Sequence, residues 1–133
     1  VGIYGTLAEP LANSLYPSGV AVAMSSAVKE GRAKMLTVVN GSAIEEFDVE
    51  IIKVAKPARA GGKSMVIRVV DEGLLARTGG IVQGMSGSPI IQDGMLVGAV
   101  THVFVSDPAR GYAVFAEQML EAAGLLGIEE PAA

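Results

Sequence analysis

Ser86 lies on a short turn whose residue types are those needed for nucleophilic catalysis. The turn spans Gly84–Pro89, with the sequence GMSGSP, and leads directly into an apolar hairpin from Ile90 to Val105. Glycines near the serine let the backbone bend sharply, so that neighbouring amide N–H groups can point at one oxygen. A serine hydroxyl beside such donors can attack a carbonyl carbon while the N–H groups stabilise the oxyanion that forms.

The residues after Ser86 distinguish between two folds that present a serine in this way. An α/β-hydrolase elbow needs a helix directly after the nucleophile. Here Pro89 and the β-branched pair Ile90-Ile91 follow, which favours a strand. We therefore expect the turn of a chymotrypsin-like serine protease, with the backbone N–H groups of Gly84 and Ser86 as the oxyanion hole. An ordinary glycine-rich hairpin without a catalytic role is the alternative at this point.

The same template suggests substrate-binding residues around the serine. Thr101, His102 and Val103 would lie on the strand that pairs with the substrate backbone. Gly80 would lie near the floor of the primary specificity pocket, and Gln83 would contact the substrate. Because glycine brings no charge to that floor, we do not expect a preference for basic side chains there.

His102 is the only histidine of the chain and so the only internal candidate for the base that activates Ser86. If Asp93-Gly94 forms a two-residue hairpin turn, counting outward from it places Ser86 opposite Thr101. His102 would then point to the other face, as a wall or core histidine, although a one-residue bulge would reverse this. Without a second His or any Cys we expect no metal site, and nothing calls for a cofactor.

Asp71 follows an apolar segment and precedes a short helical pattern at Leu74–Arg77. It can be read as the N-cap of that helix, where its side chain accepts a backbone hydrogen bond. It can also be read as the acid that orients a catalytic histidine. The residues alone leave both roles open.

The rest of the chain reads as one mainly β domain. Asn40-Gly41 and Asp93-Gly94 are strong hairpin signals, and Asp107-Pro108 is most simply a turn. An amphipathic helix is expected from about Val114 to Gly124 or Gly127. The expected strands are Val1–Leu7, Val20–Met24, Arg32–Val39, Ala43–Val54, Met65–Val70, Pro89–Gln92 and Met95–Val105. Many short strands followed by a helix indicate an all-β barrel or sandwich.

Composition excludes several other classes of protein. The 133 residues suit one domain, and a net charge of −4 without a basic block argues against a nucleic-acid partner. Zero cysteines exclude disulfides, and no apolar run is long enough to span a membrane. The chain starts at Val1 without an initiator Met or a signal peptide, as expected of a processed or excised piece.

Over nearly its whole length the sequence resembles the stage IV sporulation protein B peptidase family, serine proteases of endospore-forming bacteria. The stretch at 78–91, TGGIVQGMSGSPII, is the most specific. The other matching segments are KEG at 29–31, AK at 33–34, TVVNG at 37–41, EEFDVEI at 45–51, GAVTHVFV at 98–105, DP at 107–108 and GY at 111–112. The resemblance implies an N-terminally truncated chymotrypsin-like barrel with a C-terminal helix.

The resemblance also implies a catalytic set and a biological role. Ser86 would be the nucleophile and Asp71 the acid, while the histidine would belong to a Gly-His segment upstream of these 133 residues. Residues 1–133 would then be most of a peptidase domain, inactive alone, without its upstream PDZ domain. Related proteases cross the forespore membrane into the intermembrane space, cut themselves, and cut a membrane-associated regulator of an intramembrane protease.

Two functions outside this class stay open on the sequence alone. A non-catalytic peptide-binding module would use the edge strand at 101–105 to add a peptide strand, without depending on Ser86. A structural β-domain would complete its barrel with another segment by strand exchange. An exposed strand edge would in either case favour a homodimer.

Overall fold

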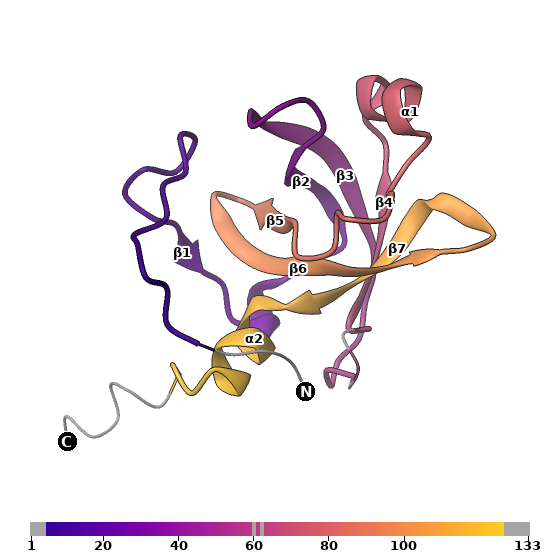
Figure 1. The fold of residues 1–133 in the computed structure, drawn as a ribbon. Helices are drawn as coiled ribbons and strands as arrows, with labels where there is room; N and C mark the ends of the chain where they lie inside the picture. Colours follow the sequence, from indigo (N-terminus) through magenta and orange to yellow (C-terminus); the bar gives the residue numbers. More distant parts are fainter. Residues whose placement is uncertain (1–4, 60, 62, 127–133) are drawn as a thin grey trace, which may run out of the picture.

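The alternating apolar residues of the sequence fold as the strands of one continuous sheet (Figure 1). This computed structural model describes residues 5–59, 61 and 63–126. Its strands are β1 (Ala21–Val22), β2 (Gly31–Val38), β3 (Ile44–Val54), β4 (Met65–Val69), β5 (Pro89–Gln92), β6 (Met95–Phe104) and β7 (Asp107–Phe115). Its helices are a 3-10 turn at Ser25–Ala27, α1 (Glu72–Thr78) and α2 (Ala116–Ala122).

The sheet closes into a barrel because β6 pairs with strands on both of its sides. The order is β1-β6-β5-β2-β3-β4-β7, and a further ladder joins β6 to β7. β2 to β7 thus form a closed antiparallel ring, while β1 adds in parallel at Met95 and Leu96. This confirms the mainly β fold that the strand pattern predicted, and of its two alternatives, barrel and sandwich, it is the barrel that forms.

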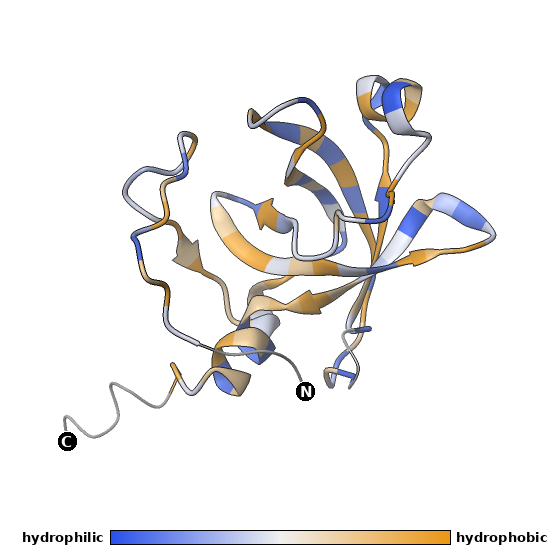
Figure 2. Cartoon of the chain, in the orientation of Figure 1, coloured by the Kyte–Doolittle hydropathy of each residue, from blue (hydrophilic) through white to orange (hydrophobic). Residues whose placement is uncertain are grey.

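Inward-facing side chains of alternate residues fill the barrel. Figure 2 shows the alternation as hydrophobic and hydrophilic bands along β3. Fully buried members come from every strand of the ring: Met35, Val49, Ile51, Met65, Ile67, Ile90, Val100 and Phe115. Burial of such side chains is the main favourable term in the stability of the domain.

Both predicted hairpin turns are present. β2 and β3 pair in register from Gly31 with Ile51 to Val38 with Ile44, around the Asn40-Gly41 turn. Asp93 and Gly94 have φ angles of 53° and 77°, as a tight two-residue turn of this hand requires. The second turn fixes the strand that leads out of the Ser86 segment against β6.

The segment after the β6 strand is where the sequence-based expectation was wrong. Asp107-Pro108 is not a simple turn but the start of β7, and α2 begins at Ala116 instead of about Val114. Pro108 and Gly111, which usually interrupt strands, lie in β7 where it packs closely against other segments. A Cβ on Gly111 would lie 2.4 Å from the His102 carbonyl oxygen, and the Pro108 carbonyl accepts a 2.7 Å hydrogen bond from Ile81.

Two further findings concern the first expected strand and the helices. The expected first strand, Val1–Leu7, falls partly outside the described residues, and residues 5–7 are not in a strand. In the part of the chain that the structure describes, neither helix has the length and apolar character needed to cross a membrane.

Candidate active site

Ser86 is exposed on its turn, whereas the residue before it, Met85, is buried. Gly84 and Gly87 have φ angles of 102° and 92°, a region that residues with a Cβ rarely adopt. Met85 is buried in the core and anchors the turn from below. The Ser86 hydroxyl donates a 3.2 Å hydrogen bond to the Thr101 carbonyl on β6. The nucleophile predicted from sequence is therefore accessible and positioned against a fixed strand.

Three of the five backbone amides from Gly84 to Ser88 donate to protein carbonyls. Those of Met85, Gly87 and Ser88 donate to carbonyls of Val82, Val100 and Met85, over 3.1, 2.7 and 3.0 Å. Within the described residues, the amides of Gly84 and Ser86 donate to no protein acceptor. These are the two amides predicted as the oxyanion hole, so both are available to a ligand.

A surface pocket of about 380 Å³ opens beside the Ser86 hydroxyl. One wall comes from the segment before the serine, and the other from β6. Its lining residues are Ile81, Val82, Gln83, Ser86, Thr101, His102 and Val103. Four of the five predicted substrate-binding residues thus meet at the nucleophile. The fifth, Gly80, is buried against Pro108 and does not line the pocket.

Ile81 and Val82 are lining residues that sequence reasoning did not single out. They directly precede Gln83 on the approach to the serine, which was the available signal. Together with Val103 they make the pocket apolar, and none of its lining residues carries a fixed charge. A small or medium apolar side chain suits such a pocket better than a lysine or arginine.

His102 lies on the same side of the hairpin as Ser86, whereas a hairpin without a bulge would place it on the other side. Gln92 pairs with Met95 as expected, but a bulge shifts the register so that Ile90 pairs with Gly98. A shift of one residue exchanges the two faces of a strand, so His102 lines the same pocket as Ser86. The ring is exposed, and its Nδ1 lies 3.0 Å from Thr101 Oγ1. His102 is therefore a wall residue of the site.

Asp71 caps helix α1 and ties it to strand β3. One carboxylate oxygen accepts from the Leu74 amide at 3.1 Å, and the other accepts from the Asp48 amide at 3.0 Å. The Asp48 bond above all, with that of Leu74, holds the pKa of the Asp71 carboxyl below its usual value, although partial burial opposes this. Asp71 does not line the Ser86 pocket, so the structure shows the cap and leaves its catalytic role a prediction.

We expect Asp71→Ala to lower the free energy of unfolding by about 1–2 kcal/mol at pH 7, because two backbone N–H groups lose their acceptor. A carboxyl whose pKa is lower when folded stabilises the protein above its unfolded pKa. That contribution disappears as the pH falls through the folded pKa. The difference in urea unfolding between wild type and variant should therefore begin to shrink below about pH 4 and continue to shrink as the pH falls through the folded pKa.

Asp71→Asn is the matched control, because asparagine is also a good N-cap but cannot ionise. We expect it to lose less stability than the alanine variant, with little dependence on pH. An alanine variant as stable as wild type at pH 7 would show that these two bonds contribute nothing.

Comparison with known proteins decides the family. The family model described as SpoIVB peptidase S55 matches residues 1–120. The chain belongs to the SpoIVB peptidase S55 family. This is the family that the matching segments of the sequence implied. No curated protein matches it.

The fold of this domain is similar to that of solved proteases. The active form of the Rv3671c protease from M. tuberculosis is 21% identical, with a TM-score of 0.58 over 86% of this chain and 49% of that one. An inactive serine-to-alanine mutant of the same M. tuberculosis protein is 20% identical, with a TM-score of 0.57 over 86% and 55%. The chain thus spans about half the length of these structures and shares their chymotrypsin-like fold.

Proposed function

We propose that this domain hydrolyses peptide bonds with Ser86 as the nucleophile. The observation that carries the proposal is the exposed Ser86 hydroxyl in a pocket, beside two backbone amides that donate to no protein acceptor in the described residues. A polypeptide substrate can bind as an added strand further along β6, because the backbone hydrogen bonds between the Ser86 turn and β6 end at Val100. The edge of β6 beside Thr101 and Val103 then faces the substrate.

The reaction would proceed through an acyl-enzyme. Ser86 Oγ attacks the carbonyl carbon while a base removes its proton, and the amides of Gly84 and Ser86 stabilise the oxyanion. The C–N bond breaks as the protonated base gives the proton to the leaving amine. Water, activated by the same base, then hydrolyses the acyl-enzyme and restores the Ser86 hydroxyl.

The base is proposed to be a histidine from outside these 133 residues, so that the chain alone is inactive. Ser86 donates at present to a backbone carbonyl, which cannot remove a proton. Asp71 is the proposed orienting acid, because a carboxylate has about four acceptor positions and the two backbone amides use only part of them. His102 is the alternative base, since it lines the same pocket.

A fluorophosphonate probe tests this proposal, since it reacts with an activated serine. We expect little labelling of the 133-residue chain, and labelling at least about tenfold faster when the upstream sequence is restored or when imidazole is added. Ser86→Ala should abolish it, whereas Ser42→Ala, an exposed serine in the β2–β3 turn, should not. Rapid labelling that is lost in His102→Ala would instead make His102 the base.

The second candidate, a non-catalytic peptide-binding module, is favoured by the open edge of β6. It predicts no labelling under any of these conditions. Peptide affinity would then be the same for wild type and Ser86→Ala. The probe and a binding titration together therefore decide between the two functions.

The biological setting is proposed from the family. The domain would act in the intermembrane space after crossing the forespore membrane, next to a PDZ domain of the same protein. It would cut its own chain and a membrane-associated regulator of an intramembrane protease. A homodimer would form by strand addition at the open β6 edge, so we expect dimerisation and substrate binding to compete.

A further inference from the structure

A second, larger concavity adjoins the Ser86 pocket along β6. Its volume is about 450 Å³, and we refer to it as the aromatic pocket. Its lining residues are Lys63, His102, Val103, Phe104, Val105, Ser106 and Tyr112. Since His102 and Val103 line both pockets, an extended peptide along β6 passes from one into the other.

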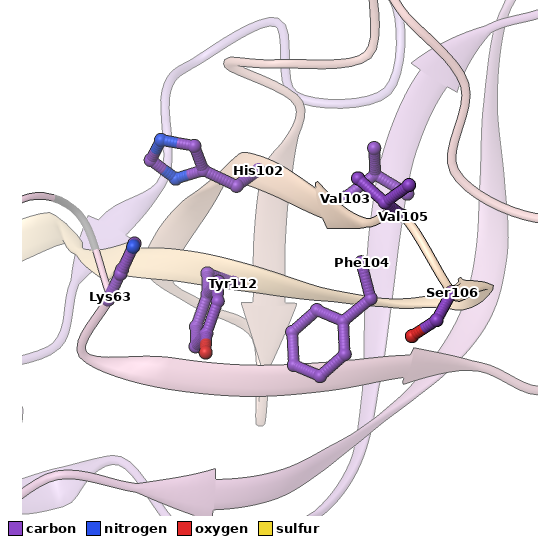
Figure 3. A pocket seen from close by; sticks show the side chains of 7 residues that line it. All are labelled: Lys63, His102, Val103, Phe104, Val105, Ser106 and Tyr112. Atoms are coloured by element: carbon purple, nitrogen blue, oxygen red, sulfur yellow. The ribbon is translucent and has the colours of Figure 1, made fainter.

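Three rings from the β6–β7 hairpin form the wall of the aromatic pocket. The Phe104 and Tyr112 ring centroids are 4.8 Å apart, and the His102 ring lies edge-on to Tyr112 at 6.4 Å. Figure 3 shows Phe104 and Tyr112 next to each other on one side of the hairpin. The cations of Lys63 and Arg110 lie 5.3 Å from Tyr112 and 5.1 Å from Phe104. These contacts pre-organise an apolar surface that is bordered by the Lys63 ammonium and by the Arg110 guanidinium, which also pairs with Asp107 at 2.8 Å.

The end of the aromatic pocket exposes apolar surface for which the domain itself provides no cover. Val105, in the two-residue turn of the hairpin, is 97% exposed, and Val103 is 36% exposed. A contiguous apolar patch with polar borders on a folded domain usually marks a binding surface. The continuity with the Ser86 pocket indicates that the occupant is the same peptide.

The register of a bound strand follows from the position of the nucleophile. Ser86 contacts the Thr101 carbonyl, so the residue whose carbonyl is attacked lies opposite Thr101. We take the added strand as antiparallel to β6, as both ring neighbours of β6 are. Counting that residue as the first, the second lies opposite His102, the third opposite Val103 and the fourth opposite Phe104. Residues directly opposite each other share a face, so the fourth side chain lies on the face of Phe104 and Tyr112.

We propose that the aromatic pocket is a specificity subsite for an apolar side chain at the fourth residue on the acyl side of the cleaved bond. This inference rests on the proposed function for its register. Leucine or phenylalanine would be covered by the Phe104 and Tyr112 rings and by Val105. Lysine and arginine would be disfavoured, because the Lys63 ammonium already lies at this border of the pocket.

The test is a binding titration that does not depend on catalysis. Acetylated, fluorescently labelled hexapeptides of alanine are titrated into the Ser86→Ala chain. They carry Leu, Phe, Lys or Ala at the fourth residue, counted toward the N-terminus from the residue whose carbonyl would be attacked. We expect Leu and Phe to bind at least about tenfold tighter than Lys, corresponding to about 1.4 kcal/mol. A peptide with Leu moved to the third residue should bind less tightly than the peptide with Leu at the fourth, because its side chain then points to the other face, away from Phe104 and Tyr112.

Variants of the pocket connect any preference to its residues. Phe104→Ala should reduce the preference for Leu over Lys to less than about threefold. Val105→Asp, at a fully exposed turn position, should do the same without affecting folding. Leu11→Ala, which truncates an apolar side chain that is 82% exposed elsewhere, should change nothing. No preference in wild type, or one that survives both pocket variants, would overturn the subsite.

The failures of the two proposals can be told apart by experiment. If the fluorophosphonate probe never labels Ser86 but the fourth-residue preference holds, the proposed peptidase function is wrong and the apolar subsite stands as part of a binding module. If Ser86 is labelled and the preference is absent, the peptidase stands and the subsite is wrong.

Discussion

Gly80→Ala is expected to lower the free energy of unfolding by about 3 kcal/mol or more and to disrupt the Ser86 pocket. A Cβ at this position would lie 2.3 Å from the Pro108 carbonyl oxygen and 2.8 Å from the Ala109 nitrogen. The φ angle of Gly80 is +136°, which a residue with a Cβ rarely adopts. Because both opposing atoms belong to the backbone, no flexible side chain can move aside to relieve the clash.

The functional part of this expectation follows from what Gly80 holds together. The next residue, Ile81, donates a 2.7 Å hydrogen bond to the Pro108 carbonyl and joins the turn before Ser86 to the β6–β7 hairpin. These two segments are the two walls of the Ser86 pocket. A side chain at Gly80 would separate them, so we expect peptide affinity to fall even where the variant still folds.

Gly79→Ala is the matched control for Gly80→Ala. Gly79 ends α1 in the left-handed region, with φ of 74°, but a Cβ there would meet no atom within 4 Å. It should therefore cost only about 1 kcal/mol, the usual penalty for that backbone conformation. Urea unfolding of both variants at pH 7 measures the difference, and equal losses would contradict the close approach to Pro108.

The parts of the fold that were predicted correctly depend on residues close together in the sequence. The Asn40-Gly41 and Asp93-Gly94 turns need only their own φ preferences and the apolar runs beside them. The turn around Ser86 likewise depends on Gly84 and Gly87, whose positive φ angles the sequence predicts from residue type. Pro89 and the isoleucines after it indicated a strand, and β5 is that strand.

The parts that were missed depend on contacts between distant segments. β7 contains Pro108 and Gly111, which by local propensity break a strand. Gly111 is there because its strand passes too close to the His102 carbonyl for a side chain, which no local pattern reveals. No local pattern reveals the bulge between Ile90 and Ile91 either. There a single extra residue in β6 turns His102 to the face of Ser86.

The sequence therefore predicted which residues form the Ser86 site better than it predicted how they are arranged. The nucleophile and the two oxyanion-hole amides follow from the spacing of Gly84 and Ser86. The aromatic pocket does not, because Lys63 and Tyr112 lie outside every strand, turn and helix that the sequence predicted. They meet His102 only because β7 closes the barrel against β6.

Ser86→Ala should reduce peptide hydrolysis by the base-containing protease on the order of 10⁴-fold or more, with stability nearly unchanged. The Ser86 side chain is exposed, and its one hydrogen bond, to the Thr101 carbonyl, can be replaced by water. Ser88→Ala should show the opposite pattern. Ser88 is 8% exposed, and its hydroxyl bonds to the buried Thr37 hydroxyl at 3.1 Å.

Replacing serine by alanine at these two positions thus separates an effect on catalysis, at Ser86, from an effect on stability, at Ser88. Loss of the Ser88 hydroxyl leaves Thr37 without that partner and should cost about 1–2 kcal/mol of unfolding free energy, with hydrolysis by the folded fraction within a few-fold of wild type. Hydrolysis at saturating peptide and urea unfolding, measured on both variants, give the two readouts. A Ser86→Ala enzyme that retains hydrolysis, or a Ser88→Ala enzyme that folds normally but has lost it, would move the nucleophile away from Ser86.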